Sequence, residues 1–190
     1  MRHVLALAAL AGVLSLGACG QGGIPGLTAH PPANPPSTQT RPPNPPQAAA
    51  LSPAEKAQLE SMVRGYLDQA QSTYAQGFQP AAGLNDEVTN LQPGTDHRYQ
   101  VNLIGGLNYR VIGACDRECS NLDIELIDSN GSVVASDMAP DDFPVVNFLA
   151  PANGRYTVRI LMQTCTLAPC YAGGRVLTSP QGGKGGATPI

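Results

Sequence analysis

The chain has little charge and few aromatic side chains. Charged residues make up 13% of its 190 positions, aromatic residues make up 5%, and tryptophan is absent. A formal net charge of −3 excludes a basic nucleic-acid-binding protein, so no nucleic acid is expected as a partner. With 18 prolines and 21 glycines, the composition also excludes a coiled coil and a multi-span membrane protein, and it leaves room for one modest domain.

Common catalytic motifs are missing as well. The sequence contains no Gly-x-Ser-x-Gly elbow, no His-Glu-x-x-His pair and no glycine-rich phosphate loop. His97, the one histidine in the part expected to be ordered, is placed in a predicted turn over 92–97, where a solvated side chain is favoured over membership of a Ser–His–Asp triad. Sugar binding is disfavoured because tryptophan platforms are absent. We therefore expect no catalytic residues and no enzyme activity, with a hydrolase as the alternative.

The first 18 residues have the layout of a secretory signal peptide. Arg2 and the α-amino group supply positive charge, 4–14 form an apolar run, and the small residues Gly17 and Ala18 follow. The apolar run is shorter than the roughly 20 residues that span a bilayer. We expect export of the chain and removal of 1–18.

The residues at the end of this segment, Leu16-Gly17-Ala18-Cys19, resemble the lipobox of bacterial lipoproteins. The resemblance implies that Cys19 becomes the first mature residue and carries acyl chains of the palmitate type, because its sulfur can hold a diacylglycerol thioether. Such an anchor attaches the chain stably to a membrane. Gly at position 20, rather than Asp, favours the periplasmic face of the outer membrane over the inner membrane. An ordinary signal peptide with a chance cysteine is the alternative.

A proline-rich segment follows the predicted anchor over 19–50. It includes the runs 31–36 and 42–46, and it has few aliphatic side chains. Such a composition cannot bury enough surface to offset the entropy of ordering, which predicts a disordered tether. At the polyproline II rise of about 3.1 Å per residue, thirty residues reach about 90 Å. The alternative is a ligand for a proline-binding groove.

An amphipathic helix is predicted over 51–77. Ser52 and Glu55 form a capping box, Pro53 occupies the first helical position, and Gly77 is a candidate C′ residue. We expect the apolar stripe to pack on the following domain, with a partner protein or a membrane surface as alternatives. The stripe comprises Leu59, Met62, Val63, Tyr66, Leu67, Ala70 and Tyr74.

From about residue 84 the hydrophobic pattern changes to alternation, which is typical of strands. Turn signals occur at 128–131 and at Asn153-Gly154, and the latter predicts a hairpin. We expect a mainly β domain over 84–178, an antiparallel β-sandwich of jelly-roll type, followed by a disordered tail over 179–190. The expected strands are 98–103, 107–111, 122–127, 133–134, 145–149, 156–162 and 171–177.

Three segments of this domain resemble bacterial pre-peptidase C-terminal (PPC-like) domains. Residues 121–137 (NLDIELIDSNGSVVASD) resemble the Asp-Leu-Asp-Leu-x-Leu-x-Asp stretch with its later Gly and Val-Ala-x-Asp. Residues 151–160 resemble the closing Gly-x-Tyr-x-Val strand, and 106–109 match an earlier Gly-x-x-Tyr. The resemblance implies a secreted, non-catalytic β-sandwich that accompanies exported enzymes. It also raises the expectation of calcium, since some PPC-like domains bind this ion.

Four cysteines lie within the predicted domain. An even number in an exported chain predicts two disulfide bonds. We favour the local pairs, because each couple flanks one loop; a zinc site of four thiolates and a reactive thiol pair are the alternatives. The favoured pairs are Cys115–Cys119 and Cys165–Cys170.

Acidic residues gather between Asp116 and Asp142, whereas every charged residue from Phe143 onward is basic. The simpler interpretation pairs Asp123 and Glu125 with Arg155 or Arg159 across neighbouring strands. The sharper interpretation is a calcium site, because several converging carboxylates suit this cation. Its candidate ligands are Asp137, Asp141, Asp142 and Asp128, with Asp116 as a further neighbour.

Together these features predict a non-enzymatic, lipid-anchored cell-envelope protein. Its β-sandwich would meet another protein or the cell wall, and it would need no cofactor. The alternative is a calcium-dependent ligand-binding or enzyme-accessory module.

Overall fold

The computed structural model describes residues 35–37 and 50–179. The signal peptide, most of the tether and the tail from 180 onward lie outside the described residues. Within the described part, one helix precedes nine strands: α1 (Pro53–Tyr74), β1 (Gln79–Pro80), β2 (Glu87–Leu91), β3 (Thr95–Leu103), β4 (Asn108–Cys115), β5 (Cys119–Ile127), β6 (Val133–Asp137), β7 (Val145–Leu149), β8 (Gly154–Cys165) and β9 (Cys170–Thr178).

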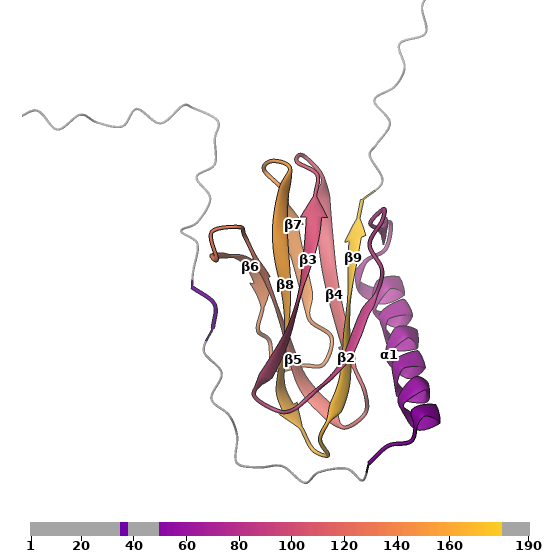
Figure 1. Cartoon of the computed structure of the whole chain (residues 1–190). Helices are drawn as coiled ribbons and strands as arrows, with labels where there is room; N and C mark the ends of the chain where they lie inside the picture. Colours follow the sequence, from indigo (N-terminus) through magenta and orange to yellow (C-terminus); the bar gives the residue numbers. More distant parts are fainter. Residues whose placement is uncertain (1–34, 38–49, 180–190) are drawn as a thin grey trace, which may run out of the picture. The chain divides into compact units, whose positions relative to one another are not determined.

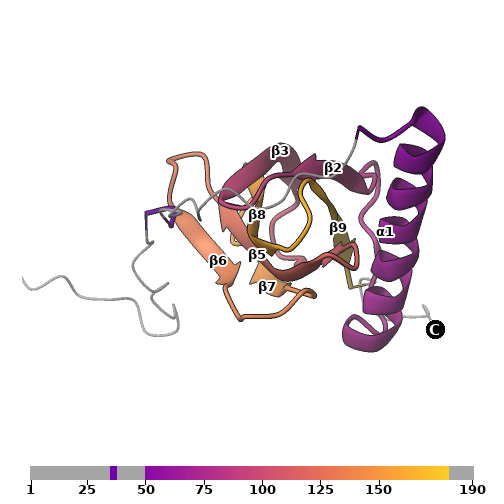
Figure 2. The same ribbon diagram turned by 90° about the horizontal axis from the view of Figure 1, so that it is seen from below.

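The strands form two antiparallel sheets packed face to face (Figures 1 and 2). The five-stranded sheet has the order β1-β9-β4-β7, with β2 also paired to β9. The four-stranded sheet has the order β3-β8-β5-β6. The predicted mainly β sandwich with one preceding helix is therefore confirmed.

Helix α1 begins at the predicted capping box. The Ser52 hydroxyl accepts a hydrogen bond from the Glu55 N–H, and the Glu55 carboxylate accepts one from the Ser52 N–H, at 2.7 Å. These bonds satisfy two backbone donors that the first helical turn leaves without intrahelical partners. The helix ends at Tyr74 with Ala75 as its cap. Gly77, with φ of 81°, was predicted at C′ but lies one position beyond it.

The buried stripe of α1 packs on the outer face of the five-stranded sheet, as Figure 2 shows, which confirms the expected packing on the following domain. This contact is apolar, and each fully buried aliphatic side chain contributes about 1.5–3 kcal/mol. Its buried residues are Leu67 and Ala70 from the helix, Ala75 from its cap, and Ile112, Ala114 and Leu177 from β4 and β9.

The main core fills the space between the sheets, where alternate residues of each strand meet. On β5 the inward residues are Leu122, Ile124 and Leu126, all fully buried, as the sequence alternation predicted. On β8 the inward series is Tyr156, Val158, Ile160 and Met162. The remaining positions of β5 and β8 point away from this core, toward the outer face of the four-stranded sheet.

The predicted topology was wrong at one turn, and two strands, β1 and β2, were not predicted. Asn153-Gly154 does not close a hairpin, because β7 pairs with β4 whereas β8 pairs with β3 and β5, so the chain crosses between sheets at this point. The sandwich also begins before residue 84, since the short β1 pairs with the end of β9. β2 was not predicted as a strand, although it forms five residue pairs with β9.

Candidate binding surface on the four-stranded sheet

The outer face of the four-stranded sheet carries charged side chains that are almost fully buried. We call it the polar face and define it by the outward residues of β3, β8 and β5: Asp96, Arg98, Gln100, Arg155, Thr157, Arg159, Leu161, Asp123, Glu125 and Ile127. Glu125 is 3% exposed and Arg159 is 5% exposed, while Leu161 is fully buried. An outward sheet face usually meets solvent, so charged side chains buried here need an opposite charge or a hydrogen-bonding group beside them.

Arg159 is the centre of a charged network on this face. It lies opposite Arg98 on β3 and opposite Glu125 on β5. Its Nη1 donates to Glu125 Oε2 at 2.9 Å, and its Nε donates to Asp96 Oδ2 at 2.9 Å. Asp96 also accepts from Arg98 Nε at 2.6 Å, so one carboxylate separates two like charges. The predicted pairing of Glu125 with Arg159 is therefore confirmed.

The network favours the charged forms of Arg159 and Asp96. Burial lowers the pKa of Arg159, but hydrogen bonds to Asp96 and Glu125 outweigh burial and raise the pKa above its usual value. For Asp96, burial raises the pKa, but hydrogen bonds from Arg98 and Arg159 outweigh it and lower the pKa overall. The face therefore holds fixed charges that orient its remaining hydrogen-bonding groups.

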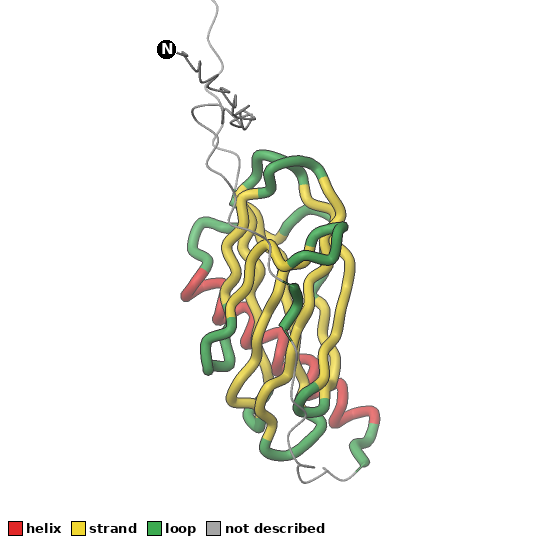
Figure 3. Tube along the Cα trace, turned by 90° about the vertical axis from the view of Figure 1, so that its left-hand side faces the viewer, coloured by secondary structure: helices red, strands yellow, loops and turns green. Residues whose placement is uncertain are grey.

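Three residues of the predicted tether, Pro35–Ser37, lie against this network. The Ser37 N–H donates to Glu125 Oε1 at 2.9 Å, and the Ser37 carbonyl oxygen accepts from Arg159 Nη1 at 2.9 Å. Figure 3 shows this segment as a short loop-coloured tube in front of the strands. The Arg159–Glu125 ion pair thus forms hydrogen bonds with both backbone polar groups of Ser37. The rest of the expected tether, Ala50 excepted, lies outside the described residues.

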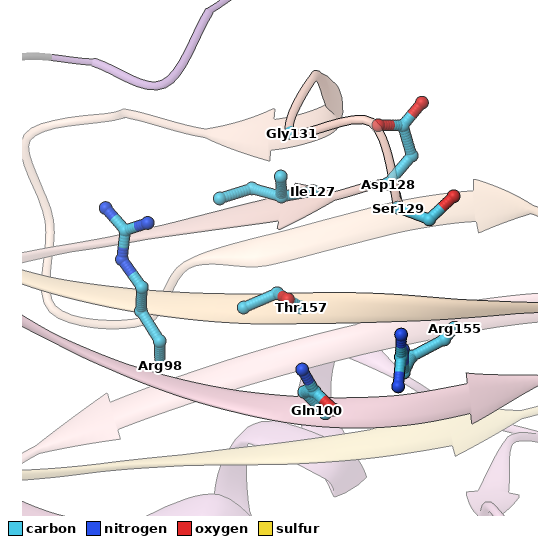
Figure 4. A pocket seen from close by; sticks show the side chains of 8 residues that line it. All are labelled: Arg98, Gln100, Ile127, Asp128, Ser129, Gly131, Arg155 and Thr157. Carbon is cyan, nitrogen blue, oxygen red and sulfur yellow. The ribbon is translucent and has the colours of Figure 1, made fainter.

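A hollow of about 270 Å³ adjoins the network on the same face. It lies one row further along the sheet, where Thr157 faces Gln100 on β3 and Ile127 on β5. Figure 4 shows Arg98 and Arg155 toward opposite ends of this hollow. Its lining of guanidinium, amide and hydroxyl groups suits the carbonyl and carboxylate groups of a polypeptide.

The calcium candidates are only partly brought together. Asp137 is the last residue of β6, and Asp141 and Asp142 lie in the loop after it, whereas Asp128 lies in the turn before β6. Three of the four carboxylates bind their own loops. Asp137 accepts from the N–H groups of Ala139 and Val145, Asp141 accepts from Phe143, and Asp128 accepts from Asn130 and Ser132. Across 35–37 and 50–179, no group of three or more His, Cys, Asp or Glu residues has metal-binding geometry.

Asp123 does not pair with an arginine, in contrast to the predicted pairing. Its Oδ2 accepts from Gln163 Nε2 at 2.5 Å, and its Oδ1 is buried without a hydrogen-bond partner. Burial raises the pKa of Asp123, a hydrogen bond from Gln163 lowers it, and repulsion from Asp137, Glu125 and Asp141 raises it further. Arg155 lines the hollow instead and is exposed.

The four domain cysteines form the two favoured disulfides. Cys115 pairs with Cys119 and Cys165 pairs with Cys170. The strand register places Cys119 opposite Cys165, so both bonds lie at the same end of the sandwich. Their sulfurs are used in covalent bonds, which leaves no thiolate for the alternative zinc site in this structure.

The sequence predicted His97 in a turn, and this prediction is wrong. The turn ends earlier, where the Thr95 N–H donates to the Gln92 carbonyl, and His97 lies within β3. Its Nε2 lies 2.9 Å from Glu87 Oε1 on β2, which links the edges of the two sheets. Its inward position and this hydrogen-bonding partner suit a structural role.

Sequence reasoning did not find Asp96, Arg98 or Ser37 as parts of a site. Asp96 and Arg98 are two positions apart on one strand, which places both on one face. That spacing was a usable signal, but their approach to Arg159 depends on strand register. Nothing in the sequence indicates that Ser37 reaches this face.

The predicted anchor cannot be placed, because Cys19 lies outside the described residues. None of the described residues form a helix with the length and hydropathy that a membrane crossing requires. A scan against protein-family models finds no matching family, and a search of curated proteins finds no match. The resemblances to bacterial lipoproteins and PPC-like domains therefore remain predictions from the residues that carry them.

Proposed function

We propose that this chain is a non-enzymatic, lipid-anchored protein of the cell envelope that presents its β-sandwich to another protein or to the cell wall. The signal-like segment 1–18, Cys19 and the proline-rich segment support export, attachment and distance from the membrane. Gly20 supports the periplasmic face of the outer membrane.

One observation carries the interaction role. Arg159, Glu125 and Asp96 are held together outside the hydrophobic core, and two of these side chains are almost fully buried. Core packing needs no such network, since a buried ion pair contributes little net stability relative to apolar residues of similar size. The network instead offers hydrogen-bonding groups in fixed positions, next to a hollow lined by Arg98 and Arg155. A polypeptide fits this chemistry better than an apolar ligand does.

The anchor is tested by metabolic labelling with palmitate. The wild-type chain is expected to incorporate label, and Cys19→Ala is expected to lose it, because the acceptor sulfur is gone. Gly20→Ala, a change at the next position, is the matched control and should retain label. Equal labelling of wild type and Cys19→Ala would reject lipidation at this residue.

The partner is tested by photo-crosslinking in intact cells. A photoreactive residue at Gln100, which is exposed in the hollow, is expected to capture a specific neighbour. The same residue at Gln69, which is exposed on α1, is the control for chance proximity. Identical products from both positions would show that the polar face is not the interaction surface.

The second candidate is a calcium-dependent or enzyme-accessory module. The observation in its favour is the buried, unpartnered Asp123 Oδ1, near the carboxylates of Asp137 and Asp141. Calorimetric titration with calcium decides this candidate. Heat of binding that disappears in Asp141→Asn would support it, and no heat in the wild-type chain would reject it.

A further inference from the structure

The contact between the ion pair and Ser37 has a chemical character that limits what can occupy it. Glu125 accepts from one backbone N–H, and Arg159 donates to the carbonyl of the same residue. Both groups belong to the main chain, and the Ser37 hydroxyl, though buried, makes no hydrogen bond. The site therefore binds backbone groups of Ser37 rather than its side chain.

We propose that the polar face is a docking site for this chain's own proline-rich segment, held in place at Ser37. Pro35 and Pro36 have no backbone N–H, so Ser37 is the first residue after this pair that can donate to Glu125. Polyproline II backbone has no internal hydrogen bonds, which leaves its carbonyl groups free for a donor such as Arg159. Prolines also restrict the free segment, so that docking costs less conformational entropy.

Because the segment belongs to the same chain as the polar face, a weak contact at Ser37 is enough to hold it there. Fifteen residues, 38–52, separate Ser37 from the first residue of α1. A short connection of this kind gives an effective concentration in the millimolar range. A contact with a dissociation constant of about 1 mM for a separate peptide is thus about half occupied within the chain.

Docking would set how far the sandwich stands from the membrane; this consequence rests on the proposed lipid anchor, whereas the contact itself does not. With the segment free, 21–50 reaches about 90 Å at the polyproline II rise. With Ser37 docked, only 21–36 remains as spacer, which reaches about 50 Å. Release of the segment would lengthen the tether and expose the backbone-binding groups to a partner with a similar extended segment.

The test changes the segment and leaves the sandwich intact. Ser37→Pro removes the N–H that donates to Glu125, whereas Ser37→Ala retains that N–H and removes only the unbonded hydroxyl. Both are made in the mature chain, 19–190, that carries Cys19→Ala, so that lipidation does not enter. NMR follows hydrogen exchange of the Arg159 side-chain N–H groups. Exchange is expected to be slow in the parent chain and in Ser37→Ala, and to accelerate about twofold in Ser37→Pro, because a segment docked about half the time protects these groups about half the time.

A second measurement adds a synthetic peptide of residues 31–46. It is expected to shift the Arg159 signals of Ser37→Pro at millimolar concentration, and to bind the parent chain about twofold or more weakly, because the docked segment competes. Unchanged Arg159 exchange in Ser37→Pro overturns the proposal, and so does equal peptide binding to both chains. Because these chains carry no lipid, either result leaves the palmitate test of the anchor unaffected.

Discussion

The two outer faces of the sandwich are covered in different ways. The five-stranded sheet is covered by α1, whose Leu67 and Ala70 pack on Ile112 and Leu177. The four-stranded sheet is contacted by Pro35–Ser37 through backbone hydrogen bonds to an ion pair. One cover is a helix of 22 residues held by apolar burial, and the other is a short segment held by polar groups.

Each face nevertheless contains one outward arginine with two carboxylate partners. On the helix side, Arg175 binds Asp86 at 2.7 Å and Asp68 of α1 at 2.8 Å. Hydrogen bonds to Asp86 raise the pKa of Arg175, burial lowers it, and the contact with Asp68 raises it further. Arg175 thus fastens a helix that apolar packing already holds. Arg159 has no comparable helix above it in the described part of the chain. It donates one N–H to the carbonyl oxygen of Ser37, which is remote in sequence.

The difference indicates which face is suited to exchange its cover. Apolar burial over a helix is lost only with a large change in free energy, whereas two hydrogen bonds at one residue are replaced at little net cost by another extended backbone. The comparison therefore favours a structural role for the helix side and places the proposed partner contact on the polar face.

The largest expected effect comes from removing the two arginines in turn. Arg159→Ala leaves Glu125 buried without its counter-charge and is expected to cost about 3–5 kcal/mol. Arg175→Ala is expected to cost about 1–2 kcal/mol, because its partner Asp68 is 72% exposed and regains water, while Asp86 keeps Arg64 at 3.8 Å. Urea unfolding at neutral pH measures both.

A double variant separates burial of charge from loss of contact. Arg159→Met combined with Glu125→Leu removes both buried charges, and it is expected to recover most of the stability that Arg159→Ala loses. Asp96 keeps Arg98 as a partner in this variant. Equal losses in Arg159→Ala and Arg175→Ala would contradict the distinction between the two faces.

Local sequence signals predicted most of the fold. The capping box at Ser52 and Glu55 and the alternation of Leu122, Ile124 and Leu126 depend on neighbouring residues, and both are confirmed. β1 and β2 were missed because they are short edge strands. Their pairing with β9 joins residues about ninety positions apart, and β1 includes Pro80, which weakens a strand signal.

The candidate site was predictable only in part. Alternation places Glu125 and Arg159 outward on their strands, and the sequence alone supported their pairing. Register then decides that Glu125, and not Asp123, lies opposite Arg159, and a shift of two residues would have reversed this. The contact with Ser37 spans 122 residues, so no local pattern indicated it.

The helix side can be weakened by one methyl group. Gly173 on β9 lies under α1, where an added Cβ would be 2.9 Å from the Glu87 carbonyl oxygen and 3.0 Å from Val63 Cγ1. Gly173→Ala is expected to cost about 1–3 kcal/mol, because β2 or α1 must move.

The matched control is Gly65 of α1, the helix that covers Gly173. Gly65 is exposed, and its added Cβ meets no heavy atom within 4 Å, so Gly65→Ala is expected to stabilise the chain by about 0.5–1 kcal/mol. Thermal unfolding of both variants measures the contrast. A neutral Gly173→Ala would show that the cover on this face is as easily displaced as the segment on the polar face.

The smallest expected effect is a difference between the two sheets in how a buried carboxylate changes the free energy of unfolding with pH. Asp116, which follows β4 in the five-stranded sheet, forms no ion pair among the described residues. Its Oδ2 accepts from the Tyr171 N–H, while Oδ1 is buried without a partner. Burial raises the pKa of Asp116 from 3.8 to about 6. Asp96, on the polar face, has its pKa lowered because its hydrogen bonds from Arg98 and Arg159 outweigh the effect of burial.

These two shifts act on stability with opposite signs. A raised pKa means that the folded chain binds the proton more tightly, so the contribution of Asp116 falls as pH rises from about 4 to about 6 and stays low above that. A lowered pKa means that the contribution of Asp96 is present above about pH 4 and is lost as pH falls below it. Asp116→Asn retains an oxygen acceptor for Tyr171, so its gain over wild type should grow by about 1–2 kcal/mol between pH 4 and pH 7. Asp96→Asn should lose stability relative to wild type over the same range, and that loss should shrink below it. Urea unfolding of the three chains from about pH 2 to pH 7 measures both slopes. Slopes of the same sign would show that the two sheets do not differ in how they hold buried charge.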